Sequence, residues 1–489
     1  MTAPVTIRFG AVDLDRIAAH EGRLVVFAEP GAGFDRTARR VNRLTRGALE
    51  RLTQSADFAD LDPGESRDVA WPAGIAAEVI QVVRLPRRPA VANARRAGAR
   101  IGAAMDRRDV LVLAGTNSRA AEISKGLALR AYSFEAHKSE PAKPRGAVSF
   151  MVSRPEAVAV EARDMAALAE GVFFARDLVN EPANILTTDD FAARLAAMQE
   201  LGVEVEILDE PALEKLGMRA LLAVGRASTS PSKVVVMRWR GGAEDAPPLA
   251  LIGKGVTFDS GGVSIKPAAG MEDMTMDMGG AAVVAGAMRA LALRRARANV
   301  VGVVGLVENM IAGDAQRPGD VVRTLKGDTV EVVNTDAEGR LLLADVLWYA
   351  QTEFRPAAMI DFATLTGAMV VALGHENAGV FANDDALCAA LLDAAQAEDE
   401  GAWRLPLSDA YDSQLKSRIA DVKNVGGRPA GSITAARFLQ RFVPDEIPWC
   451  HVDIAGVALR KQDSRFAPKG ATGWGVRMVD RLVRTRFEG

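Results

Sequence analysis

The chain has 489 residues, of which 49% are hydrophobic and 25% charged, the balance of a globular protein with a large core. Its formal net charge of −3 creates no overall field that would attract nucleic acid or an anionic membrane. Cys388 and Cys450 provide neither a disulfide framework nor a thiolate metal site, and the four histidines form no HxxxH or HExxH pair. Any bound metal must therefore be held mainly by oxygen atoms.

The first 155 residues mix short apolar segments with Ala- and Arg-rich segments. Residues 24–28 (LVVFA) and 110–114 (VLVLA) are predicted strands, and residues 120–128 are predicted to be helical. This alternation predicts a small α/β domain. It contains no cluster of catalytic type.

The unusual feature of this first part is its arginine content. The arginines concerned are Arg84, Arg87, Arg88, Arg95, Arg96, Arg100, Arg107 and Arg108. We interpret them as a solvated helix face or a subunit contact. A nucleic-acid patch is the alternative, and it is disfavoured because no aromatic residue interleaves the arginines.

A boundary between two domains is predicted near residue 155. A polar loop with two prolines is predicted over residues 138–146, followed by a strand over 147–152. A long amphipathic helix is predicted over 162–179. We therefore divide the chain into an N-terminal domain, 1–155, for oligomerisation or regulation, and a larger catalytic domain, 156–489.

The second part continues the α/β pattern to the end of the chain. A helix is predicted over residues 278–293. Apolar, β-branched runs predict four strands, over residues 234–239, 249–252, 300–306 and 359–362.

One charged segment lies between two apolar elements. A predicted strand over 329–333 and a predicted helix over 341–349 enclose the sequence NTDAEGR, which includes Asp336, Glu338 and Arg340. Charges at such a junction are typically paired or bind something, and α/β enzymes place ligands at the carboxyl ends of strands. The alternative is a solvated turn with an acidic helix start.

A second charged segment has the same position between a strand and a helix. Residues 253–277 contain Asp259 and Asp277, but they match neither a P-loop nor a GxGxxG motif. If both segments share one rim, these carboxylates converge with Asp336 and Glu338. Four unpaired carboxylates would repel one another, and two divalent cations would cancel their charge.

Two cations about 3.5–4 Å apart can hold a water nucleophile and a carbonyl oxygen together. Lys266 and Arg340 would remain as positive charges beside the neutralised carboxylates. Such charges suit the oxyanion that develops when an acyl group is transferred to water. The two segments together thus predict a two-metal hydrolase.

These residues also carry a resemblance to a known family. NTDAEGRL (334–341) with GKGVTFDSGG (253–262) closely resembles the signature of the leucyl aminopeptidase family, the cytosol aminopeptidases. Shorter segments support the resemblance: VNEPANIL (179–186), residues 264–277, DFATLTG (361–367), WCHVDIAG (449–456) and GATGWGV (470–476). The N-terminal domain matches only loosely. The resemblance implies an α/β fold in which the catalytic domain has a mixed β-sheet sandwiched by helices.

The resemblance also implies a ligand set for two divalent ions, Mn²⁺ or Zn²⁺. The tighter ion would be held by Lys254, Asp259, Asp277 and Glu338, and the looser one by Asp259, Asp336 and Glu338. Lys266 and Arg340 would be the catalytic pair, with a bicarbonate at Arg340 acting as general base. Substrate contacts are implied at Met274, Thr364, Leu365 and Gly367.

The implied function is a metal-dependent aminopeptidase. It would release N-terminal leucine or other apolar residues from peptides by attack of a metal-bridging hydroxide, in intracellular peptide turnover and as a homohexamer. The N-terminus resembles no signal peptide and no apolar run has the length of a bilayer span, so we expect a cytoplasmic protein without membrane association. The alternatives are a two-metal phosphoesterase and an architectural, DNA-binding role that rests on the arginines.

Overall fold

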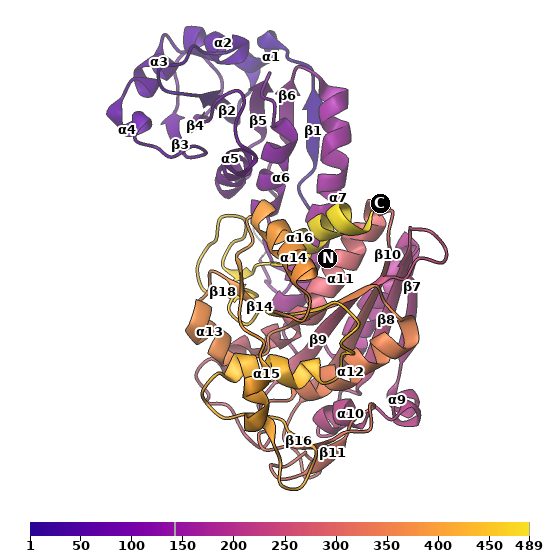
Figure 1. Cartoon of the computed structure of the whole chain (residues 1–489). Coiled ribbons are helices and arrows are strands. Elements are labelled where there is room, and N and C mark those ends of the chain that lie inside the picture. Colours follow the sequence, from indigo (N-terminus) through magenta and orange to yellow (C-terminus); the bar gives the residue numbers. More distant parts are fainter. Residues whose placement is uncertain (141–142, 489) are drawn as a thin grey trace. The chain divides into compact units, whose positions relative to one another are not determined.

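The computed structural model describes residues 1–140 and 143–488 (Figure 1). The chain forms two compact units: Met1–Phe173 with Gln462–Pro468, and Phe174–Lys461 with Lys469–Gly489. The predicted helix over 162–179 lies within α7 (Pro155–Asn180), in which the first unit ends. Our division after residue 155 stays a prediction. Residues 141 and 142 of the predicted loop lie outside the described residues.

The first unit is built on a six-stranded sheet with the order β1-β6-β5-β2-β4-β3. Neighbouring strands are parallel except for β3, which runs antiparallel to β4 at the edge. The strands are β1 (Ile7–Gly10), β2 (Arg23–Ala28), β3 (Ser66–Ala70), β4 (Val79–Arg84), β5 (Val110–Gly115) and β6 (Val148–Val152). The strands predicted over 24–28, 110–114 and 147–152 lie here.

Both faces of this sheet are buried. Along β2, Val25 packs with α5 (Val91–Ala103) and α6 (Ala120–Arg130), whereas Leu24 and Val26 belong to a core on the opposite face. This follows from the period of two residues in a strand. The opposite core is covered by α1 (Leu14–Ala19), α2 (Arg36–Leu44), α3 (Ala48–Thr53) and α4 (Ala56–Ala59).

The second unit contains an eight-stranded mixed sheet with the order β15-β14-β17-β13-β9-β10-β8-β7. Its four central strands, β17, β13, β9 and β10, run parallel to one another. The strands are β7 (Glu204–Leu208), β8 (Lys233–Arg240), β9 (Leu249–Asp259), β10 (Asn299–Asn309), β13 (Ala358–Ala363), β14 (Ala378–Ala382), β15 (Ala402–Arg404) and β17 (Trp449–Asp453).

Helices cover both faces of the mixed sheet. One face packs in a continuous core against α10 (Arg219–Gly225), α12 (Gly339–Phe354) and α15 (Gly431–Gln440). α11 (Gly279–Leu293) packs against β9 and β13 and contacts α16 (Val476–Leu482). The expected fold class, a small α/β domain followed by a mixed sheet between helices, is confirmed.

Two predicted elements differ from the structure. The strand predicted over 249–252 continues to Asp259, because β9 lies between two parallel partners that pair with it beyond residue 252. The strand predicted over 329–333 is the shorter β12 (Thr329–Glu331). It belongs to a separate three-stranded sheet with β11 (Val321–Arg323) and β16 (Val422–Lys423), so the NTDAEGR segment does not follow a strand of the main sheet.

One helical stretch has the length and composition of a membrane span. It joins the 3₁₀ helix η2 (Met271–Met278) to α11, and 83% of its most apolar window is buried inside the protein. This burial is typical of a core helix. The glycines at its start explain the close packing: a Cβ on Gly280 would lie 1.9 Å from the carbonyl oxygen of Phe362 on β13.

Asp345 is a buried carboxylate on α12 that ties three segments together. It accepts hydrogen bonds from the backbone N–H groups of Leu221 on α10 (3.0 Å) and Leu325 after β11 (2.7 Å). Burial outweighs these donors and raises the pKa of the Asp345 carboxyl from 3.8 to about 7. The folded protein therefore binds one more proton than the unfolded chain between these two values.

This proton predicts a pH dependence of stability. Below the unfolded pKa both states are protonated, and as pH rises towards 7 the folded state loses stability relative to the unfolded one. Between pH 5 and 8 the wild-type protein should lose about 2 kcal/mol of unfolding free energy relative to Asp345→Asn, which cannot titrate. Denaturant unfolding at both pH values measures this difference. The exposed control Asp314→Asn should follow the wild type; equal Asp345→Asn differences at pH 5 and 8 would contradict the assignment.

Candidate active site

β9 places two of the predicted residues, Lys254 and Asp259, on one side of the sheet. Residues five apart point to opposite faces of a regular strand. The register with β10 shifts here: Val256 pairs with Val307 and Asp259 with Asn309, so two residues of β9 lie opposite one residue of β10. This irregularity turns Asp259 to the side of Lys254.

Lys254 lies at the centre of the first half of the site and is 2% exposed. Its Nζ is 2.7 Å from Asp277 Oδ1 and 2.8 Å from Glu338 Oε1, and it donates a hydrogen bond to the carbonyl oxygen of Thr364 at 3.0 Å. Burial opposes the charge of the ammonium group, but Asp277, Glu338 and Asp259 outweigh burial and hold the Lys254 pKa above its usual value.

Lys266 bridges the second half of the site. Its Nζ lies 2.7 Å from Asp259 Oδ2 and also pairs with Asp336. Desolvation opposes its charge as well, yet Asp259 and Glu338 raise the pKa of Lys266. The structure thus brings together all four predicted carboxylates, and two ammonium groups lie between them.

The carboxylates fit a divalent cation. Asp259, Asp336 and Glu338 each offer one oxygen atom, and these atoms all lie within 4.8 Å of one another. Asp277 Oδ2 is buried and has no hydrogen-bond partner among the described residues. A buried, unpaired carboxylate oxygen is costly unless a cation compensates it, and oxygen donors suit Mg²⁺, Mn²⁺ and similar ions.

Electrostatic strain is visible in the pKa values of these carboxyls. Burial, reinforced by repulsion from Glu338, raises the pKa of Asp259 to about 6 even though Lys266 and Lys254 oppose the change. Burial also raises the pKa of Asp277 and Asp336. Glu338 differs from these three, because Lys254 and Lys266 outweigh its burial and hold the Glu338 pKa below its usual value.

Two side chains that the sequence analysis missed, Asn309 and Asp453, support the site. The amide Nδ2 of Asn309 donates a hydrogen bond to Asp259 Oδ1 at 2.7 Å. Its position at the carboxyl end of an apolar strand was a usable signal. Asp453 at the end of β17 accepts hydrogen bonds from the Leu365 N–H (3.1 Å) and the Thr366 hydroxyl (2.7 Å), and so orders the segment that follows β13.

Arg340 is almost fully buried beside the cluster, with 6% of its surface exposed. Its Nη1 donates to the carbonyl oxygen of Asn424 at 2.6 Å, while its Nε has no partner among the described residues. Burial lowers the pKa of Arg340 to about 10, and Glu338 and Asp453 oppose this effect. The guanidinium group remains charged at neutral pH and keeps donor capacity for a further oxyanion.

The four predicted substrate contacts take different positions. Thr364 belongs to the cluster itself, because its hydroxyl donates to Asp277 Oδ1 at 2.7 Å. Leu365 packs partly against the core, and Met274 lies half-buried on η2. Gly367 begins α13 (Gly367–Leu373), where a Cβ would meet no atom within 4 Å. Among the described residues, the cluster thus receives a side-chain hydrogen bond from Thr364 alone of these four.

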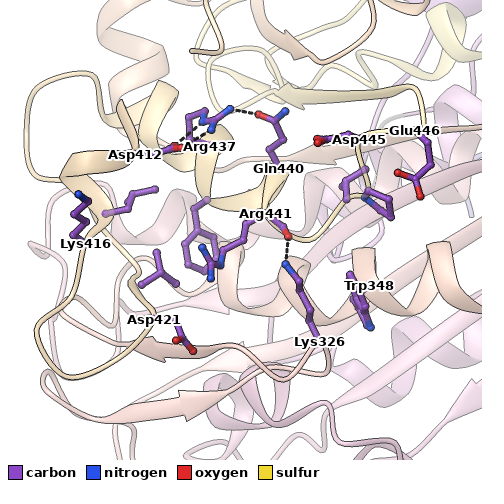
Figure 2. A pocket seen from close by; sticks show the side chains of 15 residues that line it. Lys326, Trp348, Asp412, Lys416, Asp421, Arg437, Gln440, Arg441, Asp445 and Glu446 are labelled. Atoms are coloured by element: carbon purple, nitrogen blue, oxygen red, sulfur yellow. Dashed lines mark hydrogen bonds and ion pairs between the residues drawn. The ribbon is translucent and has the colours of Figure 1, made fainter. Parts of the chain in front are cut away.

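A wide hollow of ≈ 930 Å³ lies elsewhere in the second unit (Figure 2). Its lining contains none of the predicted ligands or catalytic residues. Arg437 pairs there with Asp412 at 2.6 Å, and Lys326 donates to the carbonyl oxygen of Arg441 at 2.7 Å. Because the hollow contains none of the predicted ligands, we assign the chemistry to the carboxylate cluster.

Four of the eight arginines singled out in the first unit form ion pairs with carboxylates of the same unit. Arg84 pairs with Glu29, Arg95 with Glu122, Arg96 with Asp62 and Arg108 with Asp106 and Glu78. The arrangement does not support the nucleic-acid alternative.

Comparison with known proteins yields consistent matches. Residues 173–479 match the model of the cytosol aminopeptidase family, catalytic domain. Proteins described as probable cytosol aminopeptidases are 65% identical over 488 residues in Cereibacter sphaeroides and 57% identical over 489 residues in Dinoroseobacter shibae, with 100% of both chains covered in each case.

Solved structures extend the similarity to the fold. The bottromycin maturation enzyme BotP in complex with Mn is 33% identical, with a TM-score of 0.82 over 94% of this chain and 98% of that one. The cytosol aminopeptidase from Coxiella burnetii is 30% identical, with a TM-score of 0.81 over 98% and 99%.

The geometry around Gly339 predicts a selective defect. A Cβ at this first residue of α12 would lie 2.6–2.8 Å from Cε, Cδ and Nζ of Lys254. Since the flexible end of the lysine can yield, Gly339→Ala should displace its amine from Asp277 and Glu338 while the fold survives. We expect a loss of about a hundredfold in kcat/KM for peptide hydrolysis, the cost of about 1 Å of misplacement.

Gly313→Ala is the matched control, because a Cβ at Gly313 would meet no atom within 4 Å. Rates on a leucyl anilide and melting temperatures should be measured for both variants. A Gly339→Ala protein with the wild-type rate would show that the position of Lys254 does not matter.

Proposed function

The chain belongs to the cytosol aminopeptidase family and is a metal-dependent aminopeptidase, and we propose that it releases N-terminal residues from peptides at the carboxylate cluster of the second unit. The observation that carries the assignment of the site is the convergence of Asp259, Asp336 and Glu338, with oxygen atoms within 4.8 Å of one another. The unpartnered oxygen of Asp277 supports it.

We propose that five side chains would hold two divalent ions: Lys254, Asp259, Asp277, Asp336 and Glu338. When bound, such ions make a water molecule nucleophilic at neutral pH and polarise a carbonyl group. Lys254 can act as a ligand only in its neutral form, so it must release the proton that now pairs it with Asp277 and Glu338. Mn²⁺ and Zn²⁺ are both candidates, and the ion in BotP is Mn.

Lys266 is proposed to stabilise the oxyanion that forms from the scissile carbonyl group. Its ammonium group lies between Asp259 and Asp336 and is 19% exposed, so it reaches the open side of the cluster. Its raised pKa keeps it charged at neutral pH. A charge fixed before the reaction requires no reorganisation when the oxyanion develops.

Arg340 is proposed to hold a small anion, with bicarbonate as the candidate general base. The support is its buried guanidinium group, which has an unpartnered Nε. Asn424 fixes the group from the other side and also accepts hydrogen bonds from the Val333 and Asn334 N–H groups. Asn424 would thereby fix the anion-binding guanidinium group relative to the start of the NTDAEGR segment.

The finer features of the function are proposals too. Met274, Thr364, Leu365 and Gly367 would contact the N-terminal side chain of the peptide, and apolar residues such as leucine would be preferred. A homohexamer, a cytoplasmic location and a role in peptide turnover follow from the family resemblance.

The role of Lys266 predicts a defect in turnover. Lys266→Ala should lower kcat on a leucyl anilide by at least about a hundredfold, the usual cost of an oxyanion donor. Both ions should remain bound, because the four carboxylates are intact. Steady-state kinetics and metal analysis of the purified variant test this, with the exposed Lys215→Ala as control. A kcat within a few-fold of the wild type would disprove the role.

The two metal positions should differ in how readily they release their ion. Asp336 is 33% exposed in its side chain, whereas the side chains of Asp277 and Lys254 are 6% and 3% exposed. Mild dialysis should therefore remove one ion per chain first, from the site made only of oxygen donors, and Mn²⁺ should replace it and raise activity. Lys254→Met should weaken the slower site, since it removes the nitrogen donor.

The order of metal loss is measured by metal analysis during stepwise chelation. The rates of hydrolysis of a leucyl anilide and of a phosphate ester are measured at each step. Loss of both ions in one step, with Lys254→Met leaving affinity unchanged, would refute the ligand assignment. Activity that survives complete chelation, or hydrolysis of the phosphate ester instead of the anilide, would refute the proposed chemistry of the site.

A further inference from the structure

A hollow of ≈ 360 Å³ lies at the carboxyl edge of the sheet in the first unit. It is lined by the ends of three strands and the loops that follow them: Phe27 and Ala28 of β2, Leu85 and Arg87 after β4, and Leu113 and Asn117 around the end of β5. Its volume lies in the range of small-molecule sites. The peptidase chemistry described above uses no residue of this unit.

The order of the strands explains why a hollow lies at this edge of the sheet. The chain proceeds from β2 to β4 on one side of β2, and then returns to form β5 on the other side. The strand order thus reverses between β2 and β5. In parallel α/β sheets such a reversal leaves a crevice at the carboxyl ends of the strands, because the connecting helices go to opposite faces, and ligands bind there.

The inner wall of the hollow is apolar. Ala28, Leu85, Leu113 and Ala114 are buried, with at most 5% of their surface exposed. Phe27 and Phe34 are half-buried and also line the space. An apolar wall with two aromatic rings suits a planar ring system.

Two acidic side chains line the hollow. Glu29 pairs with Arg84 at 3.3 Å. Asp35 caps α2, where its Oδ1 accepts hydrogen bonds from the Ala38 N–H (2.7 Å) and the Thr37 hydroxyl (2.8 Å). Glu29 is therefore neutralised by its ion pair, and Asp35 is held at the start of α2.

Arg87, the arginine in the lining of the hollow, has no carboxylate partner among the described residues. It is exposed, and its Nη2 donates a hydrogen bond to the carbonyl oxygen of Gly33 at 3.1 Å. Arg88 and Arg119, in the loops that follow β4 and β5, are exposed as well. α5 and α6, which follow β4 and β5, begin at this edge without a side-chain cap. Their first N–H groups add to the positive potential.

We propose that this hollow binds a small organic phosphate of mononucleotide type, with its planar ring against Phe27 and Phe34 and its phosphate at Arg87. An apolar wall and a cationic mouth together match a ligand that has one planar apolar end and one anionic end.

The test is isothermal titration of the full, metal-loaded chain with AMP, adenosine and inorganic phosphate as separate probes. AMP should bind with saturation, and adenosine and phosphate should each bind more weakly. Arg87→Gln should weaken AMP binding about tenfold, as expected for loss of a charge-assisted contact, and should leave the rate on a leucyl anilide unchanged. Arg107→Gln removes an equally exposed arginine before β5, at the other edge of the sheet, and should leave AMP binding unchanged.

A second variant localises the ligand, because AMP could also contact the metal ions. In the Phe34→Trp variant, AMP should quench the fluorescence of the new indole at the same concentrations that saturate the heat of binding. No saturable AMP binding, an indole that does not respond, or equal losses in Arg87→Gln and Arg107→Gln would each overturn the proposal. Binding of adenosine as tight as that of AMP would overturn the assignment of the phosphate to Arg87.

Discussion

The second unit depends on one electrostatic constraint: four carboxylates share a small, mostly buried space. Lys254 and Lys266 each lie between two of them, yet the pKa of Asp259 still rises to about 6. Three of these carboxyls thus have raised pKa values even beside two ammonium groups, chiefly because they are buried. Their clustered oxygen atoms are the kind of donor that divalent cations bind.

The close packing of these charged side chains is reflected in three glycines beside them. Gly339 has no side chain because the stem of Lys254 passes over it. Gly261, with φ +86°, faces Asp336, and a Cβ there would lie 2.9 Å from its Oδ1. Gly280 lets α11 approach β13, which brings Asp277 and Thr364 together. The charged side chains come from chain segments that are far apart in sequence, and the glycines allow these segments to approach one another closely.

The first unit solves a related problem in the opposite way. It is rich in arginine, and several of these side chains, among them Arg84, Arg95, Arg96 and Arg108, pair with carboxylates of the same unit. Such pairs contribute little to stability where they are exposed. Arg87 has no carboxylate partner among the described residues and lines the hollow at the carboxyl edge of the sheet.

Hydrophobic periodicity in the sequence determined the fold class and most strands and helices, and two motifs of high specificity singled out the residues proposed for the site. The sequence also predicted that Asp259, Asp277, Asp336 and Glu338 converge, because both charged segments lie between a strand and a helix. The tertiary structure decided what no local pattern encodes. β12 lies outside the main sheet, a register shift in β9 turns Asp259 towards Lys254, and Asn309, Asn424 and Asp453 complete the site from distant segments. These features depend on strand pairing and on hydrogen bonds across about 50 to 90 positions of the chain, which local periodicity and composition do not specify.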